Sequence, residues 1–352
     1  MLRFVILGCG RIAEKHSQLL GTKMINGATL VGVCDVDISK AKKLADIYKV
    51  PCFDNIHSLM NNVQADVIVI LTPSGLHASN IFEIIQYKKH IVVEKPMTLT
   101  VKDADKVIFE CDKAGIKLFV VKQNRFNLAV KKLKSAIEQN KFGKIFLATI
   151  RVRWARHQAY YDQDKWRGTW KYDGGVITNQ ASHHVDLLEW MMGDVESVFA
   201  KSKQAIANIE TEDTAVAILN FQNGGLGLIE ATTAARPNNI EGSISILGEK
   251  GTVVIGGIAV DKILTWRFED EEDYEKDTIA DFSKEVDHVY GVGHKLYYDH
   301  VVDCIINGSP QLVDGLEGKR SVELINSIYE SIETGKEIVI KSNIKRTKLG
   351  QG

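Results

Sequence analysis

A glycine-rich turn directly follows the first apolar run of the chain. Phe4 to Leu7 has the pattern of a short buried strand, the segment Gly8-Cys9-Gly10-Arg11-Ile12-Ala13 comes next, and a helical pattern follows. In such a GxGxxA segment the first glycine permits a tight turn, and the second lets a pyrophosphate approach the backbone. An ordinary βα turn is the alternative, because the motif alone is a weak signal. The turn therefore predicts a strand–turn–helix unit of a parallel sheet.

Short β-branched runs alternate with helical patterns over the first third of the chain. The strand-like runs are Phe4 to Leu7, Thr29 to Cys34, Val67 to Leu71, His90 to Val93 and Lys117 to Val121. The helical segments are Ile12 to Leu20, Ser39 to Tyr48, Ser79 to Tyr87 and Val101 to Ala114. This alternation predicts a first domain, residues 1–121, built as a doubly wound parallel sheet of the Rossmann type.

The pattern changes after residue 121, where longer alternating runs are joined by Gly and Asn turns. The runs are Ile145 to Trp154, Thr214 to Gln222, Gly225 to Thr233 and Ile240 to Leu247. Helical patterns cover Ala129 to Gln139, Leu296 to Ile306 and Leu316 to Thr334. The acidic stretch from Thr265 to Val286 lacks periodicity and reads as a loop or edge excursion. We expect residues 122–352 to form an α+β domain with a mostly antiparallel, open-faced sheet and helices.

A carboxylate follows the second strand at the position that a dinucleotide site requires. Asp35 lies about 20 residues beyond the glycine turn, where an acid can accept hydrogen bonds from a ribose diol. The same carboxylate repels a ribose 2′-phosphate, and no arginine follows it before Ser39. The sequence therefore favours NAD over NADP as cofactor, although Lys40 leaves NADP open.

The overall composition excludes several classes of protein. The chain has 352 residues with 44 Lys and Arg against 45 Asp and Glu, so no net field attracts nucleic acid. Its longest apolar runs have strand length, and no cleavage-site pattern follows the first of them, so we expect a cytoplasmic protein without a membrane span. Five scattered cysteines without a CxxC pair predict reduced thiols and no metal site.

Two further segments lie at the carboxyl edge of the predicted sheet, where doubly wound folds bind their ligands. Thr72-Pro73-Ser74 follows the third long strand, with His77 shortly after it, and Glu94-Lys95-Pro96 follows the fourth. The alternatives are a plain proline turn, a packing histidine and a solvated lysine.

With these motifs the chain resembles the Gfo/Idh/MocA family of sugar oxidoreductases. The resemblance rests on GCGRIA, Thr72-Pro73, the EKP motif, Asn124-Arg125-Phe126, the Gly174-Gly175 segment with its histidine, and the helix around Ser327 to Ser331. It implies that Lys95 lies beside the nicotinamide and that His183, in an HxxD motif, completes the site. The cofactor contacts implied are Gly8, Gly10, Arg11, Ile12, Asp35, Thr72, Ser74, His77, Glu94, Lys95, Gln123 and Asn124.

Alcohol oxidation requires a base for the hydroxyl proton, and a histidine near its working pKa suits that role. Lys95 can stabilise the developing alkoxide, so the sequence leaves open which of Lys95 and His183 takes the proton. We favour His183 over His184, because neighbouring helical residues point about 100° apart. Most relatives carry an aspartate where this chain has Asn179, and an amide cannot act as an anionic base.

A run dense in cations and aromatics precedes the Gly174-Gly175 segment, and we expect Arg156, Tyr160, Tyr161 and Arg167 to form a pocket for an anionic ligand. Arg151 and Arg153 alternate along a strand and equally fit an exposed sheet face. The run and the string Thr178-Asn179-Gln180-Ala181-Ser182-His183-His184 resemble one subgroup, the UDP-N-acetylglucosaminuronate 3-dehydrogenases.

This resemblance implies NAD-dependent oxidation of the C3′ hydroxyl of UDP-N-acetylglucosaminuronic acid to a ketone. Substrate contacts would come from Lys95, Arg156, Tyr160, Tyr161, Arg167, Asn179 and His183. A partner aminotransferase would then act on the ketone, in making diacetamido-uronic acid sugars of lipopolysaccharide O-antigen or capsule. The resemblance also implies a homotetramer, and reoxidation of NADH by 2-oxoglutarate stays open. The alternatives are a dehydrogenase of another sugar or polyol, such as inositol, and a non-catalytic NAD-binding sensor.

Overall fold

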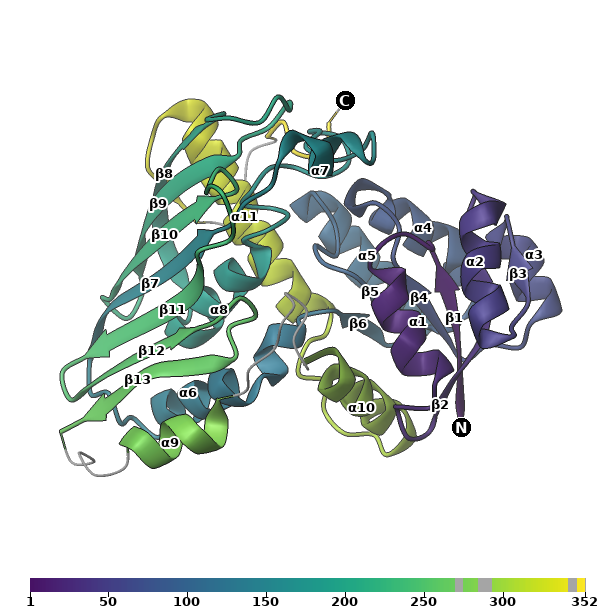
Figure 1. Ribbon diagram of the computed structural model, residues 1–352, viewed down its shortest axis with the longest axis horizontal. Coiled ribbons are helices and arrows are strands. Elements are labelled where there is room, and N and C mark those ends of the chain that lie inside the picture. Colours follow the sequence, from purple (N-terminus) through teal and green to yellow (C-terminus); the bar gives the residue numbers. More distant parts are fainter. Residues whose placement is uncertain (270–274, 284–292, 341–346, 352) are drawn as a thin grey trace. The chain divides into compact units, whose positions relative to one another are not determined.

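The computed structural model describes residues 1–269, 275–283, 293–340 and 347–351 (Figure 1). The chain divides into two compact units. The first unit combines Met1–Val121 with His294–Val322, and the second combines Lys122–Gly293 with Glu323–Gly352. The sequence-based division at residue 121 did not include the return of residues 294–322 to the first unit.

The first unit contains a six-stranded sheet in the order β3-β2-β1-β4-β5-β6, and every neighbouring pair is parallel. Its strands are β1 (Leu2–Leu7), β2 (Ala28–Cys34), β3 (Cys52–Phe53), β4 (Val67–Ile70), β5 (His90–Val93) and β6 (Leu118–Val120). The strand order reverses between β1 and β4, as in a doubly wound fold. The predicted Rossmann-type sheet is confirmed. The two-residue β3 escaped prediction because it is too short to show a period.

The helices of this unit are α1 (Ala13–Gly21), α2 (Ile38–Tyr48), α3 (Ile56–Asn62), α4 (His77–Ile84), α5 (Val101–Ala114) and α10 (Gly293–Ile306), with short 3-10 turns η1 (Ser74–Leu76) and η2 (Ile85–Tyr87). Their ends follow local chemistry. The Thr100 hydroxyl accepts the Asp103 N–H at the start of α5, and Gly115 ends that helix with a left-handed φ of +68°.

Helices cover both faces of this parallel sheet. Val5 of β1 belongs to a core that also contains Ile81 of α4 and Val107 of α5. The preceding residue, Phe4, points to the other face, because side chains alternate along a strand. There its ring lies edge-on to Tyr298 of α10, with 5.8 Å between centroids. A helix from late in the chain thus completes the layer that contains α1.

The second unit contains an eight-stranded sheet in the order β13-β12-β11-β7-β10-β9-β8-β14. The strands are β7 (Ile145–Arg153), β8 (Val195–Lys203), β9 (Thr214–Phe221), β10 (Leu226–Thr232), β11 (Glu241–Gly248), β12 (Gly251–Gly256), β13 (Lys262–Phe268) and β14 (Ile338–Val339). Among these described strands β7 and β10 form the one parallel pair. The mostly antiparallel sheet is therefore confirmed.

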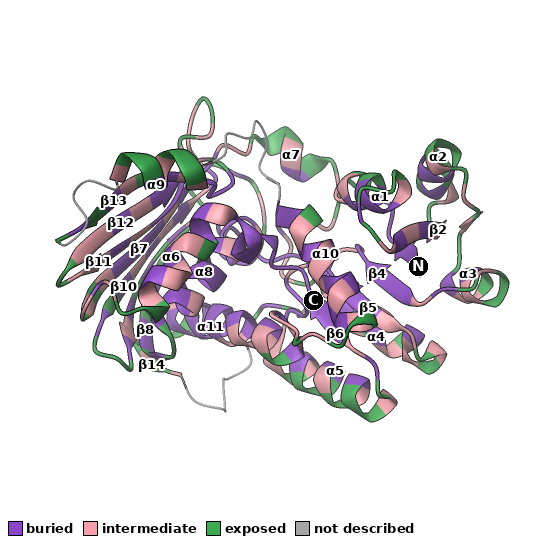
Figure 2. Cartoon of the chain, turned by 90° about the horizontal axis from the view of Figure 1, so that it is seen from below, coloured by how far each residue is buried: buried purple, intermediate pink, exposed green. Residues whose placement is uncertain are grey.

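Helices of the second unit cover one face of this sheet. These are α6 (Leu128–Glu138), α8 (Ser182–Met192) and the later part of α11 (Gly315–Thr334); the unit also contains α7 (Gln158–Asp162), α9 (Glu275–Phe282) and the 3-10 turn η3 (Gln123–Phe126). Figure 2 shows α6, α8 and α11 against the same side of the sheet. Of the helices in the described parts of the chain, none is long and apolar enough to cross a membrane.

The predicted loop from Thr265 to Val286 is wrong in two places. Strand β13 continues to Phe268, with Trp266 and Phe268 buried and Arg267 exposed between them. Helix α9 follows, and its acidic Glu275 and Asp277 lie in the first turn, where the helix dipole favours negative charge. The run of acidic residues before and within this short helix hides its apolar period in the sequence. Residues 270–274 and 284–286 of that prediction lie outside the described residues.

Candidate active site

The glycine turn connects β1 to α1, and its two glycines serve different purposes. Gly8 has a φ of +97°, and a Cβ on it would lie 2.7 Å from the main-chain carbon of Leu71. Nothing lies within 4 Å of a Cβ built on Gly10, which is exposed. Gly8 is thus required by the neighbouring strand end, while Gly10 leaves open space before α1. A pyrophosphate at the α1 N-terminus fits this space.

Asp35 stands immediately after β2 and supports the same turn. Its Oδ2 accepts the Cys9 N–H at 2.7 Å, and its Oδ1 accepts the Asp37 N–H at 2.8 Å. A carboxylate has about four acceptor positions, so both oxygens retain capacity for ribose hydroxyls. The residues present therefore fit a dinucleotide.

His77 links two of the predicted ligand segments within the first unit. Its Nε2 lies 2.8 Å from the Thr72 carbonyl oxygen, and its Nδ1 lies 2.8 Å from that of Pro96. Burial lowers the pKa of His77, so a neutral ring donates to one of the two carbonyls. The Thr72 hydroxyl donates to Asn80 Oδ1 at 2.7 Å. These contacts favour the packing alternative for His77, while Ser74, also buried, begins η1.

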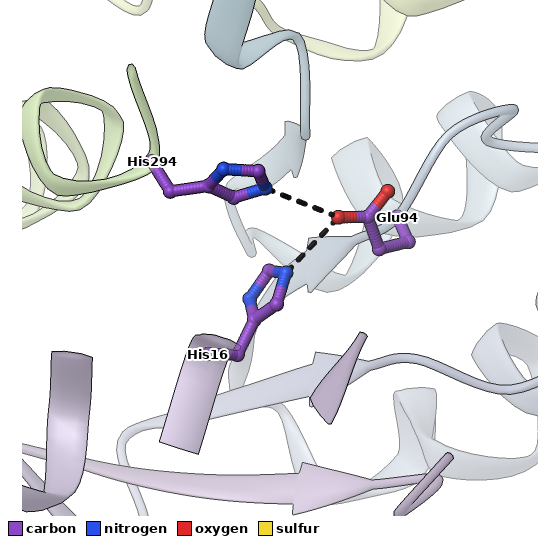
Figure 3. Close-up of side chains that lie close together, drawn as sticks. All are labelled: His16, Glu94 and His294. Carbon is purple, nitrogen blue, oxygen red and sulfur yellow. Dashed lines mark hydrogen bonds and ion pairs between the residues drawn. The ribbon is translucent and has the colours of Figure 1, made fainter. Parts of the chain in front are cut away.

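Glu94 directly follows β5, and its carboxylate points toward His16 and His294 (Figure 3). Its Oε1 lies 3.0 Å from His16 Nε2 and 3.7 Å from His294 Nε2, and its Oε2 accepts the Lys95 N–H at 2.9 Å. Burial alone would raise the pKa of Glu94, yet the hydrogen bond from His16 and the nearby His294 ring hold it well below its usual value. The carboxylate predicted to contact the cofactor thus lies beside two histidines.

His16, Glu94 and His294 are also close enough together to hold a metal ion, with their ligand atoms within 4.8 Å of one another. The sequence argument expected no metal site and missed this cluster, because its members are widely separated in the chain and follow no ligand spacing.

In the second unit, the predicted Gln123 and Asn124 lie in η3, both buried. Gln123 Nε2 lies 3.1 Å from Nε2 of His183, near the start of α8. Asp186, one turn further along α8, binds Arg125 at 2.7 Å and Lys122 more closely. Burial would raise the pKa of Asp186, but the two cations lower it to about 2. This buried ion cluster fixes α8 against η3.

The two adjacent histidines of α8 occupy different environments. His183 is half-buried and contacts Gln123, whereas His184 is 1% exposed and packs edge-on to Trp154. Neither ring nitrogen of His184 has a hydrogen-bond partner among the described residues. Burial lowers the pKa of His184 to about 4, so it is a neutral packing residue at neutral pH. This contrast favours His183 as the reactive member.

Two buried carboxyl groups that the sequence argument missed lie beside the segment leading to His183. Asp173 Oδ1 accepts the Asn179 amide at 2.5 Å. Glu212 Oε1 accepts the Tyr329 hydroxyl at 2.9 Å and the Ile177 N–H at 3.1 Å. Burial raises the pKa of Glu212 to about 7. Asp173 precedes Gly174-Gly175 directly, a position that could have drawn attention to it; Glu212 gave no such signal.

Two of the predicted anion-binding residues are arginines that gather around a third, Tyr160. Arg167 Nη1 donates to the Tyr160 hydroxyl at 2.8 Å, and its guanidinium stacks 4.6 Å from the Tyr160 centroid. The Arg156 guanidinium lies 5.4 Å from the same ring. The fourth residue, Tyr161, packs edge-on against Tyr160 with 5.1 Å between ring centroids, but it is buried and its hydroxyl lies 2.8 Å from Thr233 Oγ1.

Arg151 and Arg153 lie on a face of the sheet, the alternative that their alternation in the sequence left open. Arg153 binds Glu230 at 2.6 Å and Glu241 at 3.2 Å, and Arg151 is paired with the same acids at longer distances. Both arginines therefore belong to a surface ion network.

Comparisons with known proteins agree with this organisation. Residues 2–122 match the family model described as "Oxidoreductase family, NAD-binding Rossmann fold", and residues 134–340 match "Oxidoreductase family, C-terminal alpha/beta domain", both of Gfo/Idh/MocA. Myo-inositol 2-dehydrogenase of Thermotoga maritima is 26% identical over 97% of this chain and all of its own length.

Two solved structures are more similar. The WlbA dehydrogenase of Bordetella pertussis, in complex with NADH and UDP-GlcNAcA, is 42% identical with a TM-score of 0.92, over 97% of this chain and 98% of its own. The WlbA dehydrogenase of Chromobacterium violaceum, with the same two ligands, is 38% identical with a TM-score of 0.90, over 97% and 96%. The chain therefore belongs to the Gfo/Idh/MocA oxidoreductase family and is an NAD-dependent dehydrogenase.

Proposed function

We propose that this enzyme oxidises the C3′ hydroxyl of UDP-N-acetylglucosaminuronic acid to a ketone. The observation that carries the proposal is the 42% identity, over 97% of the chain, to a dehydrogenase solved with NADH and this sugar nucleotide. The predicted substrate residues Arg156, Tyr160 and Arg167 support it, because they form one cationic and aromatic group.

Each reacting group has a proposed role. NAD, when bound, accepts the hydride from the sugar carbon. His183 takes the hydroxyl proton at Nδ1, while the Gln123 amide, turned so that its oxygen accepts the Nε2 hydrogen, orients the ring. Lys95, which is half-buried at the end of β5, donates a hydrogen bond to the same oxygen and stabilises its developing charge.

Asn179 replaces the carboxylate of most relatives in this scheme. Its amide is held by Asp173, so it orients the substrate hydroxyl without adding charge to the site. A neutral side chain here suits an already anionic substrate, because a further carboxylate would repel the uronate.

Arg156 and Arg167 are the proposed partners of the uronate carboxylate and the diphosphate. Guanidinium groups bind such anions bidentately, and Tyr160, between them, offers an aromatic face to a ring of the ligand. Tyr161 contributes through packing, since its hydroxyl is bound to Thr233.

The proposed cellular role follows from the product. A 3-keto sugar nucleotide is a substrate for an aminotransferase, so we place the enzyme in the cytoplasmic synthesis of diacetamido-uronic acid sugars for O-antigen or capsule. NADH is either released or reoxidised in place by 2-oxoglutarate.

A homotetramer is part of the proposal, and the open face of the eight-stranded sheet supports it. Phe199, Val216, Ile218 and Leu226 are between 38% and 53% exposed on neighbouring strands of this face. Apolar side chains gathered on a sheet face favour burial against another copy.

The test is NADH absorbance with enzyme, NAD and UDP-N-acetylglucosaminuronic acid, with and without 2-oxoglutarate, and with near-stoichiometric enzyme and an aminotransferase trap. A ketone two mass units lighter than the substrate supports the proposal, and its dependence on 2-oxoglutarate identifies the recycling mode. Absence of product with NAD bound rejects this substrate.

A polyol dehydrogenase is the second candidate, favoured by the 26% identity to a myo-inositol 2-dehydrogenase across the full length. It predicts turnover of myo-inositol or free sugars without a nucleotide. The same assay with those compounds separates the two candidates, and no turnover of any compound would favour an NAD-binding sensor.

A further inference from the structure

Three separate elements of the first unit meet at Glu94. His16 comes from α1, the helix that follows the glycine turn, and His294 comes from α10 (Figure 3). Tyr298 lies on α10 as well. Glu94 itself comes from the end of β5. His16, His294 and Tyr298 are at most 1% exposed, and Glu94 is 7% exposed. We call these four residues the Glu94 cluster.

The hydrogen bonds of the cluster form one directed chain. Tyr298 Oη and His16 Nδ1 are 2.6 Å apart, and His16 Nε2 is 3.0 Å from Glu94 Oε1. With His16 neutral, the Tyr298 hydroxyl donates to Nδ1, and the Nε2 hydrogen is donated to the carboxylate. Burial lowers the pKa of His16, in agreement with a neutral ring.

The chain of bonds ends at the backbone of Lys95. Glu94 Oε2 accepts the Lys95 N–H at 2.9 Å, so one carboxylate connects α1 and α10 to the peptide that carries the lysine. The residue after Lys95 is Pro96, which has no N–H to bond elsewhere. The Lys95 amide is thus the main-chain donor through which this turn is attached to the cluster.

We propose that the Glu94 cluster positions Lys95 for the reaction, with Glu94 as the positioning residue and with His16 and Tyr298 supporting its carboxylate. This inference rests on the proposed function, because the role of Lys95 in alcohol oxidation is part of that proposal. The cluster acts through the backbone and does not contact the reacting atoms.

The competing reading of the same residues is a divalent metal site formed by His16, Glu94 and His294. Hydrogen bonds already account for the contact between His16 and Glu94, since 3.0 Å is an ordinary N–H···O distance. To bind a metal, His16 Nε2 must carry no hydrogen. His16 Nδ1 would then carry it and donate to the Tyr298 hydroxyl oxygen, the reverse of the direction given above. We therefore argue for the hydrogen-bonded cluster and include zinc in the test.

The chain supplies a matched control at the surface of the same unit. Tyr87 Oη lies 2.6 Å from His57 Nδ1, and His57 Nε2 lies 3.0 Å from Glu83 Oε1. These distances equal those of Tyr298, His16 and Glu94, but the His57 and Glu83 side chains are 42% and 40% exposed. None of the three is among the proposed site residues.

The test compares Glu94→Met, Glu94→Gln, Tyr298→Phe and the control Glu83→Met in the full-length enzyme. Methionine removes the acceptor for the Lys95 N–H. Glutamine keeps it, because its oxygen can accept the Lys95 N–H while its NH2 group donates to His16 Nε2, provided that His16 carries its hydrogen on Nδ1. Hydrogen exchange of a peptide spanning Val93 to Leu99 reports on the Lys95 amide without substrate or cofactor. Turnover and the dissociation constant of NAD are measured on the same samples.

We expect exchange of this peptide to accelerate on the order of tenfold in Glu94→Met, the loss of about one hydrogen bond. We expect kcat to fall about 100-fold, as a misplacement of about 1 Å can produce, with NAD affinity within about threefold of wild type. Glu94→Gln should keep most of the wild-type exchange protection and most of the wild-type kcat. Glu83→Met should change neither the exchange nor kcat. Tyr298→Phe gives a smaller acceleration, on the order of twofold to threefold, and remains informative if Glu94→Met does not fold.

Equal exchange in wild type, Glu94→Met, Tyr298→Phe and Glu83→Met would overturn the positioning role even in an active enzyme. A zinc-dependent rise in the melting temperature of wild type that Glu94→Met abolishes would replace it with the metal site. If wild type does not oxidise the sugar nucleotide but the Lys95 amide responds as expected, the proposed substrate fails and the cluster stands.

Discussion

The side-chain amide of Asn179 donates to the buried carboxylate of Asp173, with 2.5 Å between Nδ2 and Oδ1. The other oxygen of Asp173 accepts the Gly168 N–H at 2.8 Å, so the carboxylate is held from both sides. Because Nδ2 is directed at Asp173, the amide oxygen of Asn179 points away from that carboxylate. The pair explains how an amide can occupy the family's usual acid position with a defined orientation.

Restoring the aspartate at residue 179 should therefore impair the enzyme. In Asn179→Asp, two carboxyl groups meet where an amide and a carboxylate now lie, so one of them takes up a proton. We expect kcat/KM to fall on the order of tenfold, with a new ionisation in the pH–rate profile. The double variant Asp173→Asn/Asn179→Asp recreates the pair in reverse and should recover activity. No recovery in the double variant would mean that residue 179 acts independently of Asp173.

Replacing His183 with Asn should lower kcat by about 100-fold or more, because general bases contribute factors of this size. NAD should still bind, since the glycine turn and Asp35 are unaltered. Steady-state turnover and NAD titration of the same variant provide the measurement. Near-normal turnover would move the base role to Lys95, since His184 is buried and packed against Trp154.

The sequence was sufficient for those parts of the molecule whose chemistry is local. The turn from Gly8 to Ala13, the acid Asp35 after β2 and the alternation of strands and helices are each contained within a few residues. Their structural consequences depend on backbone sterics and side-chain period, which a single segment determines.

Long-range contacts were not predictable in this way. The His16–Glu94 bond joins residues 78 apart in sequence, and Tyr329 reaches Glu212 across 117 residues. The contacts of Glu94 with His16 and His294 were hidden for the same reason, because its motif shows its position at the sheet edge but not the direction of its carboxylate. Tyr161 and Tyr160 were indistinguishable in sequence, although packing turns one toward Thr233 and the other toward Arg167.

Asp35→Ala should weaken NAD binding and reduce the discrimination against NADP. The carboxylate accepts the Cys9 N–H, so alanine also loosens the phosphate turn, whereas Asp35→Asn keeps an acceptor and removes the charge. We expect Asp35→Asn to lose the discrimination against NADP, with a smaller loss of NAD affinity than Asp35→Ala. Titrations of both variants with NAD and NADP provide the measurement, and an unchanged ratio of the two affinities would exclude Asp35 as the ribose ligand.

His184 should make the protein less stable in mild acid. Its pKa falls from 6.5 to about 4 on folding, so below pH 6.5 the unfolded chain binds a proton that the folded chain does not. This difference removes about 3 kcal/mol of unfolding free energy as pH falls from the unfolded to the folded pKa. Denaturant titrations at several pH values should show a shallower acid dependence for His184→Leu than for wild type. An identical slope would mean that the His184 ring becomes hydrated.

Glu212 should make the protein less stable at alkaline pH, in contrast to the acid effect of His184. Burial raises its pKa from 4.5 to about 7, so the folded carboxyl retains a proton that the unfolded one releases above pH 4.5. The contribution of Glu212 to the unfolding free energy is fully present below pH 4.5, and about 3 kcal/mol of it is lost as the pH rises through 7. Glu212→Gln keeps acceptors for the Tyr329 hydroxyl and the Ile177 N–H without ionising. Its unfolding free energy should therefore exceed that of wild type at pH 8 and approach it at pH 5.

The same ionisation should affect the segment from Gly174 to His183, because Glu212 is in contact with it. A Cβ on Gly175 would lie 2.2 Å from the Glu212 carboxyl, and the Tyr329 hydroxyl that Glu212 accepts also binds the Gly175 N–H at 3.0 Å and Thr178 at 2.9 Å. A charged Glu212 in this enclosed site draws in water or shifts the segment that leads to His183. Wild-type kcat should consequently decline above pH 7, while Glu212→Gln stays active to higher pH. The exposed Glu196, changed to Gln, serves as the control, and a decline shared by all three proteins would assign the alkaline limb to another group.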